Sequence, residues 1–163
     1  IFKYFKIKKE SMSFEKRLEE LFIELPEVPK LSLGVVPVVS EGKILYVGQC
    51  FPLSAGKIAH KGRVGIEVTL DQARMAARHA LLVGLSAIRE ETGSLNEIKQ
   101  FIQMAGFVAS GGEFQEHDRV LEMASKLLID IFGKAGRHTR LAVGVNQLPQ
   151  NACVALSLIV SLR

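Results

Sequence analysis

The sequence predicts a single α+β domain in which two long helices share one face of a sheet. The chain has 163 residues, which is the length of one ordinary domain. Two long segments carry apolar side chains at helical spacing, and strand-like apolar runs lie before, between and after them. Because no internal repeat or low-complexity tract interrupts this pattern, we expect one domain over residues 13–163.

The N-terminal segment differs from the rest of the chain in charge. Of the 21 lysines and arginines, four lie in residues 1–12, together with one of the 17 acidic residues. We expect residues 1–12 to form a flexible basic extension, with a natural start at Met12. The rest of the chain is then nearly neutral, which argues against an extended surface for nucleic acid. Ser13 is a good N-cap, and apolar residues at helical spacing predict a first helix over residues 14–25 that Pro26 ends.

The first strands and the first long helix follow. Strand-like runs cover residues 35–39 and 43–49, with a turn at Glu41-Gly42, and a loop after them contains a short predicted strand at 63–67. Thr69 and Gln72 form a capping-box pattern that opens a helix ending near Glu91. One face of this helix carries mostly alanine and glycine, so we expect its backbone to approach a flat surface such as a sheet.

The second half repeats the alternation of strand and helix. A long strand is predicted over 98–108, a helix over 118–132 that Gly133 ends, and two final strands over 140–146 and 152–162. With the earlier segments, the order is helix, strands, helix, strand, helix and two strands. Both long helices can cover the same face of one sheet.

Several kinds of site have no support in the sequence. Cys50 and Cys153 lie in apolar runs, so we expect small buried side chains and no disulfide. The four histidines form no metal-ligand spacing, and no phosphate-binding glycine motif occurs, so we expect no metal and no cofactor. No apolar stretch is long enough to span a membrane. Without a signal-peptide or transit-peptide pattern, we expect a cytoplasmic location, with the mitochondrion as the alternative.

One short segment concentrates polar groups that could contact a ligand. Gly136-Arg137-His138-Thr139-Arg140 lies between a predicted helix end and a predicted strand start. An arginine at a strand entrance can present a planar pair of donors to a carboxylate. Two other interpretations stay open. Arg137 and His138 can offset the negative end of the preceding helix, and Arg140 can form an ordinary ion pair.

The C-terminal segment GRHTRLAVGVNQLPQNACVALSLIVSL resembles the signature of the YjgF/RidA superfamily, also labelled endoribonuclease L-PSP. Arg140, Val143, Val145, Leu148 and Pro149 fall at the spacing of that signature. GKILYVGQ and TLDQARMAARHALLVGLSAIREETGSLNEI resemble its first strands and its long helix. The resemblance covers about residues 28–163 and fits best a divergent subgroup with an extra N-terminal helix.

This resemblance implies a chorismate-mutase-like fold with a single mixed sheet. It implies a homotrimeric barrel with ligand clefts between subunits, in which Arg140 binds the carboxylate of a 2-oxo acid, enamine or imine. Gly48 matches a glycine that lines the cleft. Superfamily members of the deaminase branch hydrolyse enamines and imines, so the resemblance implies hydrolase activity. The prediction requires that no acidic neighbour neutralises Arg140.

The sequence departs from the superfamily pattern at five cleft positions. These are Val36, Val47, Glu122, Ala142 and Ala155, of which the last stands where the superfamily has a water-positioning glutamate. Alanine can neither hold water nor take its proton, so we expect weak imine hydrolysis at most. Two alternatives remain, an endoribonuclease acting on single-stranded RNA and a non-catalytic scaffold or chaperone-like module.

Overall fold

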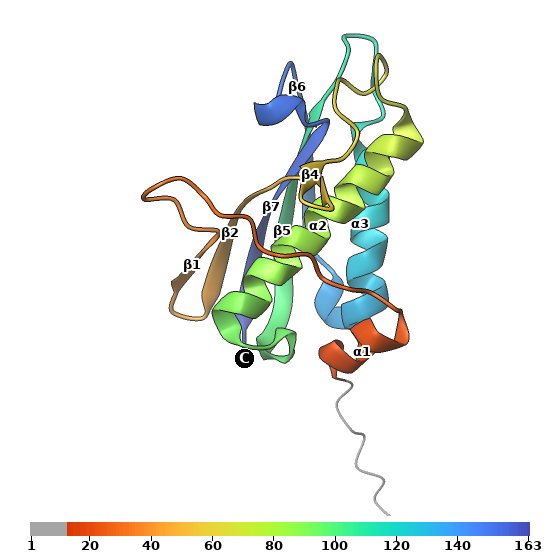
Figure 1. Ribbon diagram of the computed structural model, residues 1–163. Coiled ribbons are helices and arrows are strands. Elements are labelled where there is room, and N and C mark those ends of the chain that lie inside the picture. The colour runs from red at the N-terminus through yellow and green to blue at the C-terminus, as the bar shows by residue number, and fades with distance from the viewer. Residues whose placement is uncertain (1–12) are drawn as a thin grey trace, which may run out of the picture.

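The computed structural model describes residues 13–163, and the predicted basic extension lies outside them. A five-stranded sheet is covered on one face by two long helices (Figure 1). The helices are α1 (Phe14–Glu20), α2 (Leu70–Thr92) and α3 (His117–Phe132). The sheet strands are β1 (Val38–Glu41), β2 (Ile44–Cys50), β5 (Ile98–Ala109), β6 (Thr139–Val145) and β7 (Val154–Leu162). A small separate hairpin contains β3 (Leu53–Ser54) and β4 (Lys57–Ile58).

The sheet is mixed, and its strand order places β1 and β6 at opposite edges. The order is β1-β2-β7-β5-β6, and all neighbours are antiparallel except β5 and β6. A parallel pair needs a crossover connection, and α3 supplies it between β5 and β6. The predicted α+β class, with two long helices on one sheet, is therefore confirmed.

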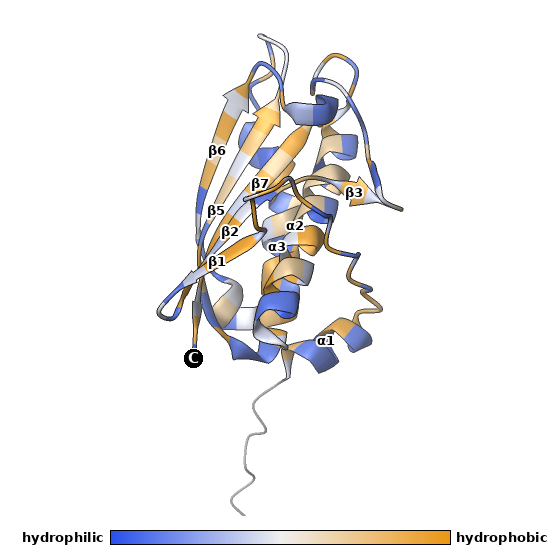
Figure 2. Ribbon diagram, turned by 60° about the vertical axis from the view of Figure 1, so that its left-hand side comes forward, coloured by the Kyte–Doolittle hydropathy of each residue, from blue (hydrophilic) through white to orange (hydrophobic). Residues whose placement is uncertain are grey.

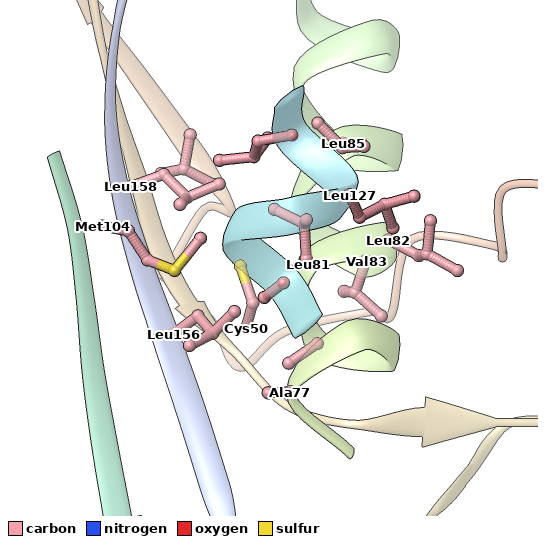
Figure 3. Close-up of a cluster of buried hydrophobic side chains, with 14 of the residues drawn as sticks. Cys50, Ala77, Leu81, Leu82, Val83, Leu85, Met104, Leu127, Leu156 and Leu158 are labelled. Atoms are coloured by element: carbon pink, nitrogen blue, oxygen red, sulfur yellow. The ribbon is translucent and has the colours of Figure 1, made fainter. Parts of the chain in front are cut away.

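Helix α2 packs closely on the sheet, as its small side chains predicted. Thr69 and Gln72 form a reciprocal capping box, and Gly93 ends the helix in the left-handed conformation. A methyl group added at Gly84 would lie 3.1 Å from Leu158 Cδ1 and 3.2 Å from Cys50 Sγ. Figure 3 shows the buried apolar side chains of the strands and of both long helices meeting in this region.

Helix α1 is shorter than predicted. It ends at Glu20, and Phe22 adopts a φ of 54° with its side chain 94% exposed. Leu21, Ile23 and Leu25 nevertheless pack partly buried against the core. The left-handed backbone conformation at Phe22 ends the helix, although the helical spacing of apolar residues continues to Leu25.

Two strands predicted in the N-terminal half differ from the structure, one in its bounds and one because its residues form a turn. The strand predicted over residues 35–39 begins at Val38, directly after Pro37. Residues 63–67 form a tight turn, in which the carbonyl of Arg63 accepts hydrogen bonds from the backbone N–H groups of three residues, Ile66, Glu67 and Val68. The Glu67 carboxylate also accepts a bond from the Arg63 N–H at 2.9 Å. Gly65, with a φ of 87°, permits the turn.

Among residues 13–163, no helix covers the second face of the sheet (Figure 2). Leu158 is buried beneath the helices, so its neighbour Ile159 points to the opposite face, and the strand register places Tyr46 beside Ile159. Val39, Tyr46 and Leu141 lie on this uncovered face and are 53%, 51% and 49% exposed. Aliphatic and aromatic side chains thus face solvent across several strands of one subunit.

Candidate ligand-binding site

Arg140 lies on the edge strand β6, on the face of the sheet that α3 covers. It pairs with Met104 of β5, which in turn pairs with the buried Leu158, so all three share that face. Its side chain is only 24% exposed. The strand thus positions the guanidinium beside α3, at the border between the core and solvent.

Arg140 contacts two side chains of α3. Its Nη1 donates a hydrogen bond to Ser125 Oγ at 3.1 Å, and its Nη2 lies 3.4 Å from Asp118 Oδ1. The prediction of an arginine without an acidic neighbour is therefore wrong, because the crossover helix brings Asp118 beside β6. However, Asp118 is 75% exposed, and exposed ion pairs contribute only about 0–1 kcal/mol because water screens them.

An open cavity of about 630 Å³ surrounds the guanidinium. Its lining includes three cations and one carboxylate, with residues Asp118, Ser125, Lys126, Ile129, Arg137, His138 and Arg140. Lys126 is engaged with Asp130 on its own helix. The cavity has the volume of a small-molecule site and an excess of positive charge, so it suits an anion.

His138 is fixed by two hydrogen-bonding contacts. Its Nδ1 lies 2.7 Å from the carbonyl oxygen of Gly136, and its Nε2 lies 2.9 Å from Ser125 Oγ. Ser125 thus contacts both Arg140 and His138. The sequence pattern indicated Arg137, His138 and Arg140 but not Ser125. Its spacing from Asp118 is seven residues, or two helical turns, and this spacing could have indicated that both face β6.

A second, apolar cavity lies near the opposite edge of the sheet. It has a volume of about 150 Å³, and Val36, Pro37, Gly48, Gln49 and Cys50 are among its lining residues. Burial raises the pKa of the Cys50 thiol to about 12, so this thiol is protonated at neutral pH. This cavity offers apolar contacts and backbone groups without a reactive side chain.

The remaining predicted site residues lie outside both cavities. Val47 is buried beneath α2, and Ala142 shares the face of Arg140 but packs against the core. Glu122 points to α2, with its carboxylate 3.9 Å from Arg74 Nη2. Ala155 is fully buried on the other face of the sheet, among Ala109, Leu148 and Ala152. Of the seven predicted positions, only Val36 and Gly48 line the same cavity of the described structure.

Arg140 and the apolar cavity cannot contact the same small ligand within one subunit. Strand β6 is separated from β2 by β5 and β7, which at ordinary strand spacing is roughly 14 Å. Within residues 13–163, no group of three or more metal-ligating side chains is found. No described helix has the length and apolar character needed to cross a membrane.

Comparison with known proteins identifies relatives over almost the whole chain. The family described as "YjgF/chorismate_mutase-like, putative endoribonuclease" matches residues 15–162. Protein TCP17 of Trypanosoma cruzi is 33% identical over 147 residues, which are 90% of this chain and 92% of that protein.

Solved structures agree with this assignment. A crystal structure of a protein of unknown function from Agrobacterium tumefaciens is similar with a TM-score of 0.85 and 38% identity, over 92% of each chain. A "putative endoribonuclease" from Shewanella oneidensis MR-1 has a TM-score of 0.89 and 31% identity, over 93% of this chain and all of that one. The fold, the match of residues 15–162 and these relatives together establish that the chain belongs to the YjgF/Rid family.

Proposed function

We propose that the protein binds a small carboxylate, a 2-oxo acid or its imine or enamine, in a cleft between subunits of a homotrimer. The observation that carries this proposal is the cavity around Arg140. Its guanidinium is largely buried and is held by Ser125, and its acidic neighbour Asp118 extends into solvent. A ligand carboxylate can replace Asp118 at small cost and accept two parallel hydrogen bonds.

The positions of the two cavities support a site shared between subunits. Arg140 lies at one edge of the sheet, and the apolar cavity with Gly48 lies toward the other edge. In a closed ring, the first edge of each subunit meets the second edge of its neighbour. The uncovered sheet face, with Tyr46 and Leu141 exposed, would become the apolar interior of such a ring.

The chemistry of the lining limits the ligand to a small anion with an aliphatic remainder. Arg140 provides a charged fork, and Val36 and Gly48 would supply an apolar wall from the neighbouring subunit. Such a site suits a short 2-oxo acid and the imine or enamine from which it forms by hydrolysis. We propose hydrolase activity on the imine or enamine. This activity is weak, because Ala155 provides no group to activate water.

Titration calorimetry with 2-oxobutanoate tests the binding site. The Arg140→Ala variant should bind at least about tenfold more weakly, because a hydrogen bond to a charged group contributes about 1.5–3 kcal/mol. Arg119→Ala is the matched control, since Arg119 lies on α3 and pairs with Glu116 at the surface. Equal affinity of the wild type and Arg140→Ala would exclude this role, and a wild type that binds no carboxylate would favour the scaffold.

Cleavage of single-stranded RNA is the second candidate. The family description includes this activity, and the cations Lys126, Arg137 and Arg140 share a cavity with His138, which could suit a phosphate. Incubation of the purified protein with a single-stranded RNA separates the two functions. Cleavage that Arg140→Ala abolishes would favour the nuclease, and intact RNA would favour the carboxylate site.

A further inference from the structure

A continuous chain of hydrogen bonds connects Arg140 to the backbone through Ser125 and His138. Arg140 Nη1 lies 3.1 Å from Ser125 Oγ, Ser125 Oγ lies 2.9 Å from His138 Nε2, and His138 Nδ1 lies 2.7 Å from Gly136 O. All three side chains line the cavity in which we propose that the carboxylate binds.

The chemistry of the two ends determines the direction of every bond in the chain. The carbonyl of Gly136 can only accept, so Nδ1 of His138 carries a proton. In the neutral imidazole, Nε2 is then an acceptor, and the hydroxyl of Ser125 must donate to it. Arg140 can only donate, so Ser125 Oγ accepts its N–H. The Ser125 hydroxyl is therefore oriented toward a base while a cation contacts its oxygen.

Packing fixes the position of the carbonyl that orients His138. A Cβ atom at Gly136 would overlap the backbone of Leu128 in α3, so the chain there lies directly against the helix that carries Ser125. The imidazole and the hydroxyl are thus held on two elements that cannot move apart without disturbing this contact. A nucleophilic oxygen, a base and a group that orients the base are the three parts of an activated hydroxyl.

We propose that Ser125 and His138 form a proton relay that activates water for imine hydrolysis beside Arg140. The inference rests on the proposed function, because it needs a 2-imino acid whose carboxylate Arg140 binds. It assigns to these residues the proton transfer that Ala155 cannot perform, since Ala155 is buried on the opposite face of the sheet.

The relay requires only water and the imine. As the oxygen of water bonds to the imine carbon, the electron pair of the C=N double bond moves to nitrogen. The attacking water gives a proton to Ser125 Oγ, and the Ser125 proton passes to His138 Nε2. The imidazolium then returns this proton to the nitrogen, which gives a neutral carbinolamine with a C–OH and a C–NH2 group. The remaining hydroxyl proton passes through Ser125 Oγ and His138 Nε2 to the nitrogen, the C–N bond breaks to release ammonia, and the C=O bond of the 2-oxo acid forms.

Two measurements on the same variants separate the relay from the binding site. Affinity for 2-oxobutanoate is measured by calorimetry, and the hydrolysis rate is measured on a 2-imino acid that an amino-acid oxidase generates from L-leucine. Ser125→Ala and His138→Gln should both lose about 10²–10⁴-fold in rate. His138→Gln should keep its affinity within a few-fold, whereas Ser125→Ala also removes the hydrogen bond that holds Arg140 and should bind up to about tenfold more weakly. Ser125→Thr keeps the hydroxyl and should keep most of the rate. Ser40→Ala and His60→Gln, both at exposed positions outside the cavity, are the matched controls.

The pH profile provides a readout that a purely structural role would not change. The wild-type rate should fall toward acidic pH, because a protonated imidazole cannot accept the proton, and His138→Gln should lose this dependence. The charged groups that face His138 across the cavity are Asp118, Lys126, Arg137 and Arg140. In Asp118→Asn the hydrolysis rate should therefore still fall toward acidic pH. This result would separate the response of His138 from that of the carboxylate.

The possible outcomes distinguish the proton relay from the proposed carboxylate-binding site. Variants that bind and hydrolyse like the wild type would overturn the relay and leave the carboxylate site intact. The same conclusion follows if the wild type binds 2-oxobutanoate but hydrolyses no imine. A wild type that does not bind would instead remove the proposed function on which the relay rests.

Discussion

The carboxylate of Asp118 lies 3.4 Å from Nη2 of Arg140, across the space between α3 and β6. The two residues are 22 positions apart, and the crossover from β5 to β6 brings them together. Asp118 occupies the side of the guanidinium on which we expect a ligand carboxylate. Asp118 would therefore compete with that carboxylate for Arg140.

Removal of this competitor should strengthen ligand binding. In Asp118→Asn, Arg140 loses an exposed partner worth about 0–1 kcal/mol, so the affinity for 2-oxobutanoate should rise by up to about fivefold. Calorimetry at low and high salt measures the change, which should shrink as salt screens the charges. Asp71→Asn is the control, because Asp71 is also exposed and pairs with Arg74 away from the cavity. Weaker binding in Asp118→Asn would mean that the carboxylate assists the ligand.

The uncovered sheet face should hold the subunits together. Replacing Tyr46 or Leu141 with aspartate places a charge in the proposed ring interior, where burial is costly, and should dissociate the assembly. Light scattering after size-exclusion chromatography gives the mass of each variant. Phe22→Asp is the control, since Phe22 is 94% exposed and lies outside the sheet. A wild type with the mass of one chain would contradict the ring.

Gly84 should be required for close packing of α2. In Gly84→Ala the added methyl would lie 3.1 Å from Leu158 Cδ1, so the gain of about 1 kcal/mol in helix propensity should be outweighed by crowding of about 1–3 kcal/mol. Urea unfolding measures the change in the free energy of unfolding. Gly112→Ala serves for comparison, because no atom lies within 4 Å of the added Cβ. A more stable Gly84→Ala protein would show that the strands can move away.

The buried thiols should make the fold sensitive to alkaline pH. Burial raises the pKa of Cys50 from 9.0 to about 12 and that of Cys153 from 9.0 to about 11. Because the unfolded chain loses these protons first, the full stability is present below pH 9 and declines as pH rises toward 11 and 12. Urea unfolding of Cys50→Ala against the wild type should give a shallower decline above pH 9. Equal slopes would mean that other groups cause the decline.

The sequence predicted the parts of the fold that local patterns determine. The capping box at Thr69 and Gln72 and the small side chains of α2 indicated both the start of this helix and its close approach to the sheet. The C-terminal signature around Arg140 indicated the family. These features depend on residues within one or two helical turns, or within one strand, of each other.

The sequence could not predict features that depend on distant contacts. Helix α1 ends early at the left-handed residue Phe22, and Leu21, Ile23 and Leu25 pack against a core formed largely by later residues. In the site, Asp118 and Ser125 meet Arg140 only after α3 has crossed over the sheet. The seven-residue spacing of Asp118 and Ser125 indicates that they share one helix face, but only the position of β6 shows that this face meets Arg140.

Within residues 13–163, the strand that carries Arg140 is hydrogen-bonded to a neighbouring strand on one side only, because β6 is the last strand of the sheet. In a parallel edge strand, about half of the amide groups point away from the partner and can exchange hydrogen with solvent. In a dissociated subunit, amide exchange along residues 139–145 should therefore alternate between slow and fast, whereas contact with a neighbour in the proposed ring should slow the fast positions. Binding of any molecule to this edge should slow amide hydrogen exchange at the positions that exchange fast in the unpaired strand.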